Sequence, residues 1–546
     1  MILQTFILLV FGYIVWEKVI KLYYNYWYYT SQGIKATDFP LPIIGALHKF
    51  AMSLRGRTLQ NEHPTLEYFK SRFGDNMPPI IYDMKIPTGA LIINDPEIVL
   101  ELFTGAKAKY VEKWEPMKPL YQSLIGKKGV ISMQTKDPSL AVRRKHVSAA
   151  FYKDRLTKQL EDVIRITFDR VNDIKEDLKK QKDELNLIQW VGDLVMYNIQ
   201  VCVFGIDCAK QELGYHENGS IQQLSVAMFL KKVTVNMFMR MIKVHRLCFS
   251  TLNSFFIGQS ERDYKKNAEI FRQFLKNVIQ ERKNRIKLSK DYQIHDFLDI
   301  LLTDDLYEGK DEDILDECCV FMLAATQTTL TAINNTLIYI YKEGQILQKL
   351  RSEVTQNFPF NDISEVILFV SYIQVTTEMW IKQFNYDKMA AESTYIQKVV
   401  LEALRIEPPL RLTSRYELSE DLELKGYKIK KGQPLAFNIW GLANDPKTWI
   451  EPEKFIPERF DTESKYFLTP DGKKRKSTSF ITFFGGLRVC IGKTFAESVI
   501  KTICPIVIAN FNMEFKDKSL YERKIPISVD VEPEIFVKIS LNTQKI

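Results

Sequence analysis

Residues 483–492 read FFGGLRVCIG, and the segment KTFAESVI follows directly at 493–500 with the pattern of a helix. Cys490 thus stands just before a predicted helix, where the helix dipole and backbone amides stabilise a thiolate. Gly486 and Gly492 let the backbone come close to a flat partner, and Arg488 supplies a fixed cation beside it. An inert buried thiol is the alternative for a lone cysteine. The five matching positions of F-x-x-G-x-R-x-C-x-G favour a loop that holds a flat, anionic group through one sulfur ligand.

The composition of the whole chain is that of a globular protein. It has 546 residues, of which 46% are hydrophobic and 26% charged, and this usage excludes a disordered, collagenous or wholly membrane-embedded chain. The net charge of +8 is mild for this length and predicts no nucleic-acid partner. The seven cysteines are odd in number and form no C-x-x-C pair. This disfavours a disulfide framework or a structural zinc site and indicates a body that faces the cytosol.

The N-terminus predicts a membrane anchor. Residues 2–16 are apolar apart from Gln4 and Thr5, and extension to Tyr24 gives the roughly 30 Å needed to cross a bilayer if the lysines snorkel. A cleaved signal peptide and a buried helix are the alternatives, but no basic residue precedes the apolar run. Because Lys18 and Lys21 follow it, the C-terminal side should be cytosolic.

A connector and one large body should follow the anchor, which is assigned to residues 1–24. The connector, 25–45, begins with an aromatic run that is typical of a membrane interface. It ends with Pro40 and Pro42, which make it stiff and extended. The catalytic body is expected at 46–546.

Hydrophobic spacing predicts the fold class of the body. Apolar residues recur at intervals of three and four between 140 and 280, as in amphipathic helices, whereas 422–437 and 525–539 favour short strands. The predicted class is therefore mainly α with a minor β region. The unusually apolar stretch 221–257 is either core or a surface that contacts substrate or membrane.

Several motifs resemble those of the cytochrome P-450 family and occur in the family's order, over roughly residues 37–546. Besides the cysteine loop they are PLP, LAATQTT, EALR and PERF, at 40–42, 323–329, 402–405 and 457–460. The resemblance implies a single large helical domain with small sheets. It also implies haem b, iron protoporphyrin IX, with Cys490 as thiolate ligand and Arg488 beside a propionate. Phe483, Gly486 and Gly492 are the other cofactor-binding positions of the loop.

The resemblance assigns Glu402 and Arg405 to a structural ion pair, with Arg459 as the third partner. Residues three apart share a helix face and can pair, although an isolated E-x-x-R is most often a solvated pair. This network is expected to fix the segment that carries the Cys490 loop, without a part in the reaction.

The LAATQTT segment resembles the oxygen-activating helix of the family, in which a hydroxyl beside bound oxygen helps to deliver protons. Thr328 holds that position, and Gln327 replaces the usual acid, so it can position water but not titrate. Ala325 replaces the usual glycine. A threonine that only bonds to its own helix is the alternative. Ala324 stands where a fatty-acid-hydroxylating branch carries a haem-linking glutamate, so no covalent link is expected.

Two further arginines are expected at the haem propionates. Arg144 lies in the helix for which the family pattern is W-x-x-x-R, although Leu140 replaces the tryptophan and removes an indole donor. Arg415, ten residues after Arg405, stands where another propionate-binding arginine is common. Taken alone, the run of Arg143, Arg144 and Lys145 would most often be a solvated face.

Two stretches leave alternatives open. The segment 366–384 is either an insertion that is atypical of the family or a gene-model error. The basic run Lys473, Lys474, Arg475 and Lys476 is either a solvated loop or a patch that docks an acidic flavoprotein reductase. A nuclear signal would conflict with the anchor.

The sequence thus predicts a monomeric haem-thiolate monooxygenase in the endoplasmic reticulum membrane, with one N-terminal pass and a cytosolic body. It would insert one atom of O2 into an apolar lipid, sterol or xenobiotic-like substrate. Electrons would come from NADPH through a flavoprotein reductase, with cytochrome b5 as a further donor. The alternatives are a haem-thiolate isomerase or dehydratase that rearranges a peroxide without a reductase, and a non-catalytic haem or lipid binder.

Overall fold

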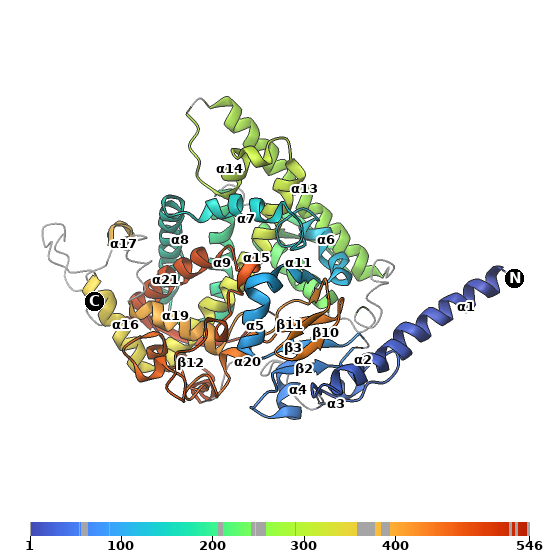
Figure 1. The fold of residues 1–546 in the computed structure, drawn as a ribbon. Helices are drawn as coiled ribbons and strands as arrows, with labels where there is room; N and C mark the ends of the chain where they lie inside the picture. The colour runs from blue at the N-terminus through green and yellow to red at the C-terminus, as the bar shows by residue number, and fades with distance from the viewer. Residues whose placement is uncertain are drawn as a thin grey trace, which may run out of the picture.

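The protein is mainly α-helical with small sheets, as its sequence predicts (Figure 1). The computed structural model describes residues 2–53, 55, 64–86, 88–205, 211–241, 246, 258–289, 291–357, 377–383, 394–522, 527–529 and 533–542. Helices make up most of this body, and the largest sheet lies on the side nearest the N-terminal helix.

One long helix organises the α-helical part. This is α15 (Asp311–Lys342), and most of its side chains are buried. Three acidic residues in its first turn stabilise the positive end of the helix dipole. Its neighbours are α9 (Leu187–Phe204), α13 (Gln259–Leu288), α19 (Tyr395–Ile406) and α21 (Lys493–Asn510). Because α15 touches both α19 and α21, it connects the E-x-x-R helix with the helix that follows Cys490.

The remaining helices surround this centre, and the longest of them shows why they form. In α8 (Lys153–Lys179) the side chains of Leu160, Val163, Ile164 and Phe168 are all buried, which confirms the amphipathic helix that their spacing predicts. The others are α3 (Leu47–Ser53), α4 (Pro64–Phe73), α5 (Pro96–Phe103), α6 (Lys118–Ile125), α7 (Leu140–Ser148), α11 (Val226–Met241), α14 (Phe297–Leu302), α16 (Gly344–Asn357), α17 (Thr377–Gln383) and α20 (Ile439–Ala443).

The β structure consists of small sheets. The largest has the strand order β1-β2-β3-β11-β8-β4, and Leu435 of β11 lies opposite Leu91 of β3 in one of its two parallel pairs. Its strands are β1 (Lys35–Ala36), β2 (Ile80–Asp83), β3 (Ala90–Ile93), β4 (Val111–Lys113), β8 (Tyr416–Leu418) and β11 (Pro434–Phe437). The others comprise β9 (Leu422–Leu424) with β10 (Tyr427–Ile429), β12 (Phe511–Phe515) with β13 (Phe536–Leu541) and β5 (Glu184–Asn186), and β6 (Glu212–Glu217) with β7 (Ser220–Ser225). Strands expected at 422–437 are confirmed, and β13 confirms the end of the expected tail strand.

The two ambiguous stretches are described in part. Within 221–257, β7 and α11 are described, and Phe229, Leu230 and Val233 of α11 belong to the main core. This favours the core interpretation for α11, whereas 242–245 and 247–257 lie outside the described residues. Of the segment 366–384, only α17 is described. Its Trp380 is buried against the Phe168 ring of α8, with centroids 5.8 Å apart.

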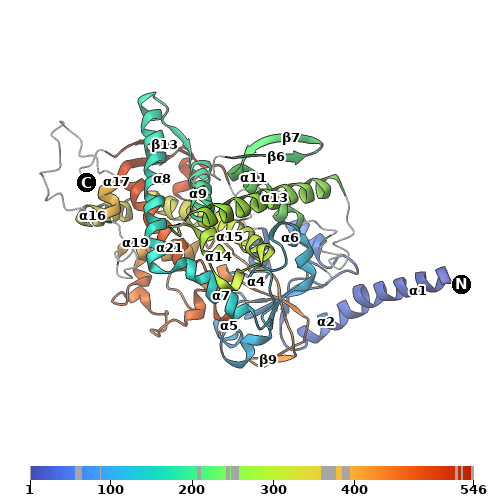
Figure 2. The same ribbon diagram turned by 90° about the horizontal axis from the view of Figure 1, so that it is seen from above.

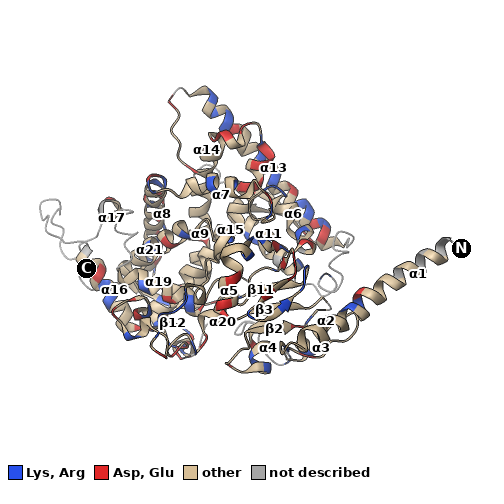
Figure 3. Ribbon diagram, in the orientation of Figure 1, with Lys and Arg blue, Asp and Glu red and all other residues tan. Residues whose placement is uncertain are grey.

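The N-terminal segment is helical from residue 2 to residue 30. It consists of α1 (Ile2–Val15), a π-helical turn (Trp16–Ile20) and α2 (Lys21–Thr30). Figures 1 and 2 both show α1 pointing away from the body, and Figure 3 shows no charged residue along its described length. Leu8 and Leu9 are each 69% exposed. Within the described ranges, the one helix long and apolar enough to cross a membrane by itself is α9, and most of that helix is buried in the core.

We expect lysine at Leu8 and Phe11 together to release the protein from membranes. Each lysine near the centre of an inserted helix costs about 2.5–3.5 kcal/mol. The parent should pellet with microsomes and resist alkaline carbonate, whereas L8K/F11K should appear in the carbonate supernatant. Val235→Lys, at an exposed apolar position of α11, is the matched control and should stay in the pellet. Protection of the body from protease added outside sealed microsomes would contradict the cytosolic orientation.

Candidate functional site

The Cys490 loop is a tight turn closed by its own backbone. The Cys490 amide donates to the Phe483 carbonyl over 2.8 Å, and the Phe484 amide donates to that of Ile481 over 2.7 Å. Gly486 has a positive φ of 57°, and a Cβ there would overlap the carbonyl of Phe103 in α5. Glycine is therefore required at this position both by its backbone conformation and by the space available.

The thiol of Cys490 differs from the other described cysteines in its surroundings. Cys202, Cys318, Cys319 and Cys504 are buried, whereas Cys490 is exposed to solvent. Desolvation by neighbouring protein atoms nevertheless raises the pKa of its thiol, whereas the hydrogen bond from the Gly492 amide and the positive charge of Arg144 lower it. Cys490 is thus the accessible thiol among the described cysteines, and it lies three residues before the first residue of α21.

A stripe along α15 is also accessible, although the helix is otherwise mostly buried. Ala324 is exposed and Phe321, Ala325 and Thr328 are half-buried. These positions repeat at three and four, so they share one helix face. The Phe321 ring lies 5.9 Å from that of Phe495 in α21, which places this face beside the helix that Cys490 precedes. We infer that the stripe and the Cys490 loop border the same space.

The polar residues of the LAATQTT segment divide between this stripe and the core. Thr328 lies on the stripe, and its hydroxyl donates to the Ala324 carbonyl over 2.6 Å. Thr326 makes the equivalent bond to Met322 but is buried, and Gln327 and Thr329 are buried as well. Thr328 therefore bonds to its own helix, as in the alternative interpretation, and still presents its oxygen to the accessible face. Gln327 lies off that face.

Two adjacent arginines of α7 have opposite environments. Arg143 forms an ion pair with Asp313 of α15 and lies 3.7 Å from a carboxylate oxygen of Glu317. Arg144 instead donates to the carbonyl of Val489, next to Cys490. Burial is the main reason that the pKa of Glu317 is raised to about 7. Of the pair, Arg144 is the one placed at the cysteine loop.

The three arginines expected at the propionates form no ion pair with a carboxylate of the described residues. Arg488 donates to the Met133 carbonyl over 2.7 Å and to the Thr135 hydroxyl. Arg415 stacks on the ring of Trp114, 5.2 Å from its centroid, and its Nη1 is buried with no hydrogen-bond partner. Burial lowers the pKa of Arg144, Arg415 and Arg488, and none of the three is ion-paired within the described ranges. Such cations fit a ligand that brings its own anionic groups.

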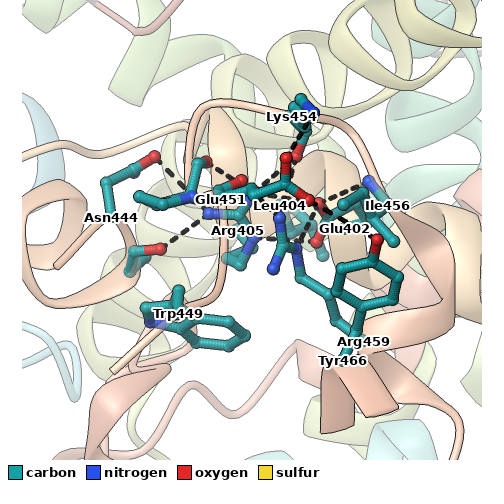
Figure 4. A network of polar contacts seen from close by, with 12 residues as sticks. Glu402, Leu404, Arg405, Asn444, Trp449, Glu451, Lys454, Ile456, Arg459 and Tyr466 are labelled. Carbon is teal, nitrogen blue, oxygen red and sulfur yellow. Dashed lines mark hydrogen bonds and ion pairs between the residues drawn. The ribbon is translucent and has the colours of Figure 1, made fainter. Parts of the chain in front are cut away.

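The three residues expected to form a structural network meet in the core (Figure 4). Glu402 accepts from Arg405 Nε over 2.7 Å and from Arg459 Nε over 3.0 Å, and all three side chains are fully buried. Arg405 also donates to the Ala443 carbonyl and Arg459 to that of Glu451. The Thr482 hydroxyl donates to Leu404 in α19. The network thereby connects α19, the segment 443–459 and the approach to the Cys490 loop.

The expected surface run at 473–476 needs a correction. Lys473 and Lys474 are exposed, and Lys476 pairs with Glu97. Arg475, however, turns inward, donates to the Arg459 carbonyl over 2.5 Å and stacks on Trp449. A guanidinium can donate hydrogen bonds to several carbonyl groups at once, which makes this inward position favourable. Arg475 therefore belongs with the buried network.

Sequence reasoning missed Trp114 as well as the inward turn of Arg475. Leu140 is buried at the start of α7 and offers no donor. The indole beside Arg415 comes instead from the residue directly after β4, and its backbone amide donates to the Arg415 carbonyl. No motif marks Trp114, because its role depends on how β4 and β8 pair.

Comparisons with known proteins identify the family of the chain. A family model described as cytochrome P450 matches residues 38–534. Cytochrome P450 CYP82J17 of Trigonella foenum-graecum is 25% identical over 533 residues, which cover 92% of this chain and 91% of the relative. Leukotriene-B4 omega-hydroxylase 3 of Mus musculus is 25% identical over 346 residues, which are 61% of this chain and 59% of the relative.

A solved structure supports the fold. The crystal structure of the cytochrome P450DA heme domain superposes with a TM-score of 0.68 and 18% sequence identity. The match covers 93% of this chain and 98% of that chain. The expected fold, one large helical domain with small sheets, is confirmed.

We expect Cys490→Ala to abolish the red-shifted Soret band of the reduced, carbon monoxide-bound protein, because that band requires a thiolate ligand. Cys202→Ala and Cys504→Ala, which change buried thiols, are controls and should keep it. Absorbance spectra of the three purified variants decide the matter, and a Cys490→Ala protein that kept the band would exclude this ligand.

We expect Glu402→Ala to lower the free energy of unfolding by about 3–5 kcal/mol, because it leaves two buried guanidiniums without their carboxylate. Urea unfolding followed by circular dichroism measures the change. Glu281→Ala removes an exposed partner of Arg285 and should cost no more than about 1 kcal/mol. Equal costs for the two variants would show that the network does not hold the core.

Proposed function

We propose that this chain, which belongs to the cytochrome P450 family, is a membrane-anchored monooxygenase acting on an apolar, lipid-like substrate with electrons from NADPH through a flavoprotein reductase. Members of the family are oxidoreductases that carry haem on a cysteine thiolate and use O2, a small-molecule substrate and redox partners. One observation carries the assignment to this chain. Its accessible Cys490 and three half-buried arginines that form no ion pair in the described ranges lie near the accessible stripe of α15.

These residues fit the haem and would hold it in distinct ways. Cys490 would ligate the iron, and the bound haem supplies the activation of O2. Arg144, Arg415 and Arg488 would pair with the propionates, because burial lowers the pKa of each and none forms an ion pair within the described ranges. The buried network of Glu402, Arg405 and Arg459 would keep the loop in place through its backbone bonds.

Thr328 would manage protons at the accessible face of α15. Its hydroxyl hydrogen is committed to the Ala324 carbonyl, so its oxygen is left to accept a hydrogen bond from a water. A water held there can pass a proton toward the site of oxygen reduction. Gln327 is buried and has no titratable group, so it would act on this water only indirectly, through the position of the helix turn.

The accessible stripe also supports the proposed class of substrate. Apart from Thr328 it is formed by Phe321, Ala324 and Ala325, and such a surface favours an apolar ligand. One relative is named as a hydroxylase of a leukotriene, which agrees with a lipid-like substrate. The electrons would enter through a reductase that docks near the exposed Lys473 and Lys474. Lys476 is exposed as well but pairs with Glu97 of α5.

We expect Thr328→Ala to release more hydrogen peroxide per NADPH consumed and to form less product. Positioned proton transfer is worth about 10²–10⁴-fold, so its loss diverts reduced oxygen to peroxide. Gln327→Glu should couple at least as well as the parent. The matched control is Thr326→Ala, which removes an equivalent helix bond that is buried off the stripe, and it should couple normally. Peroxide, NADPH and product are measured together with reductase present.

The same assays separate the alternative functions. A monooxygenase product carries one oxygen atom from labelled O2, and its formation consumes NADPH. Turnover of a peroxide without NADPH would instead identify an isomerase or dehydratase, which does not need an acid next to Thr328. Equal coupling in Thr328→Ala and Thr326→Ala would remove Thr328 from the proton path.

A further inference from the structure

One residue of the loop 126–135 connects a buried carboxylate with the arginine of the cysteine loop. The amide of Val130 donates to Glu317 of α15 over 3.1 Å, and the carbonyl of the same residue accepts from Arg488 over 3.5 Å. The loop lies close against α15 here, because a Cβ on Gly129 would come within 2.7 Å of the Val320 side chain. A movement of Val130 relative to α15 therefore moves a carbonyl group that orients the Arg488 guanidinium.

A second path from the same carboxylate runs through Arg143 of α7. The Nη1 atom of Arg143 lies 3.7 Å from an oxygen of Glu317 and donates to the carbonyl of Lys128 over 3.0 Å. The next residue of α7, Arg144, donates to the carbonyl of Val489 in the cysteine loop. The charge of Glu317 thus faces the cation that fixes α7 to the loop 126–135, and α7 carries one of the arginines expected at the haem.

The surroundings of Glu317 come from four parts of the chain. Its charged and titratable neighbours are Arg143 of α7, Tyr307 of the turn at 305–307, and Cys318, Asp313 and Asp316 of α15, with Arg272 of α13 paired to Asp316. The Tyr307 hydroxyl donates to the Glu317 carboxylate over 3.4 Å. His146 of α7 pairs with Asp304 over 2.8 Å, and an imidazole can also change its charge near neutral pH.

Glu317 itself changes its charge close to neutral pH. Burial raises the pKa of its carboxyl group to about 7, although the Val130 amide, Arg143 and Tyr307 each act to lower it. The ionised group accepts from the Val130 amide and attracts Arg143 with a full charge, whereas the protonated group loses most of that attraction. Ionisation therefore strengthens both paths toward the cysteine loop.

We propose that Glu317 is a positioning residue for the haem, because its ionised carboxylate holds the loop 126–135 and α7 where Arg488 and Arg144 reach the propionates. This rests on the proposed pairing of both arginines with the propionates. Haem should be held more tightly when Glu317 is ionised than when it is protonated. By linkage, each unit by which haem binding shifts the pKa of Glu317 corresponds to about a tenfold change in haem affinity.

The direction of the pH dependence separates positioning from a purely structural role. Because burial raises the pKa of Glu317, its ionisation costs folding free energy as the pH rises from the ordinary value of that pKa to about 7. A residue that only supports the fold would make the protein less stable, and haem easier to lose, at about pH 8 than at about pH 6. Positioning predicts the opposite, a slower loss of haem at the higher pH.

Transfer of haem from the full-length holoprotein to excess apomyoglobin measures the rate of haem loss. Absorbance follows the transfer between about pH 6 and about pH 8, and each preparation is first checked for the red-shifted Soret band of its reduced, carbon monoxide-bound form. Glu317→Gln has the shape of the protonated group and keeps an acceptor for the Val130 amide. The matched controls are His146→Gln and Glu312→Gln, an exposed acid of α15 that pairs with Lys276 over 2.6 Å.

The parent should lose haem about tenfold faster at the lower pH than at the higher one, with the change centred near pH 7. Glu317→Gln should lose haem at the fast rate throughout, and both controls should keep the pH dependence of the parent. Tyr307→Phe removes a hydrogen bond that lowers the pKa of Glu317, so it should move the centre of the change to higher pH.

Equal pH profiles in the parent and Glu317→Gln would overturn the proposal, and so would a slower loss of haem at the lower pH. A pH dependence that disappears in His146→Gln but persists in Glu317→Gln would assign it to the imidazole instead. An unshifted centre in Tyr307→Phe would overturn the proposal even if Glu317→Gln failed to fold. A parent that lacks the red-shifted Soret band would overturn the proposed function as well.

Discussion

The buried carboxylate of Glu402 is the constraint on which the geometry around Cys490 depends. It accepts from two side-chain nitrogens of Arg405, from Arg459 and from the Ile456 amide. Two guanidiniums face one carboxylate where no water reaches, so the remaining donors must be satisfied by carbonyl groups. Those of Ala443, Pro452 and Glu451 provide this, and the otherwise irregular segment 443–459 thereby acquires a fixed path.

Arg475 adds a third cation to this network, through its hydrogen bond to the Arg459 carbonyl. Its pKa falls to about 10, because it is buried and lies near the positive charge of Arg459. The protein tolerates it through carbonyl acceptors and the face of Trp449. Positive charge in excess of carboxylate is therefore present both in this network and at Arg144, Arg415 and Arg488. On the network side, backbone oxygens balance it, whereas on the side of Arg144, Arg415 and Arg488 the propionates of haem would do so.

How much the sequence predicts depends on how local each interaction is. Cys490 and the pair of Glu402 and Arg405 are recognisable because their spacing within one turn or loop fixes their geometry. The resemblance placed Gln327 together with Thr328, but the structure separates them, since helical neighbours differ by about 100° around the axis and Gln327 is buried. Arg475 and Trp114 could not be identified in this way, because their surroundings come from segments distant in the sequence.

The aromatic run at residues 23–29 also shows that composition alone does not predict which surface a side chain contacts. Tyrosines beside an apolar helix have the composition of a membrane belt, and composition does not reveal that Tyr29 packs on Tyr82 or that Gln32 pairs with the Lys428 backbone. The connector was expected to be an independent segment for the same reason. Aromatic residues suit both a membrane interface and a protein core. Only the packing of α2 against the sheet distinguishes these two environments here.

One loop aligns the two sides of the candidate site. The backbone amides of Lys127 and Lys128 donate to Asp316 in the first half of α15, over 2.9 Å and 2.8 Å, and a Cβ on Gly126 would overlap that carboxylate. Seven residues beyond Gly126, the carbonyl of Met133 accepts from Arg488 in the Cys490 loop. The loop 126–135 is thus held by acid on α15 at one end and by the arginine two residues before Cys490 at the other. A shift of α15 would therefore be transmitted to the cysteine through this loop as well as through α21, and the accessible stripe and the thiol are kept in register by two independent connections.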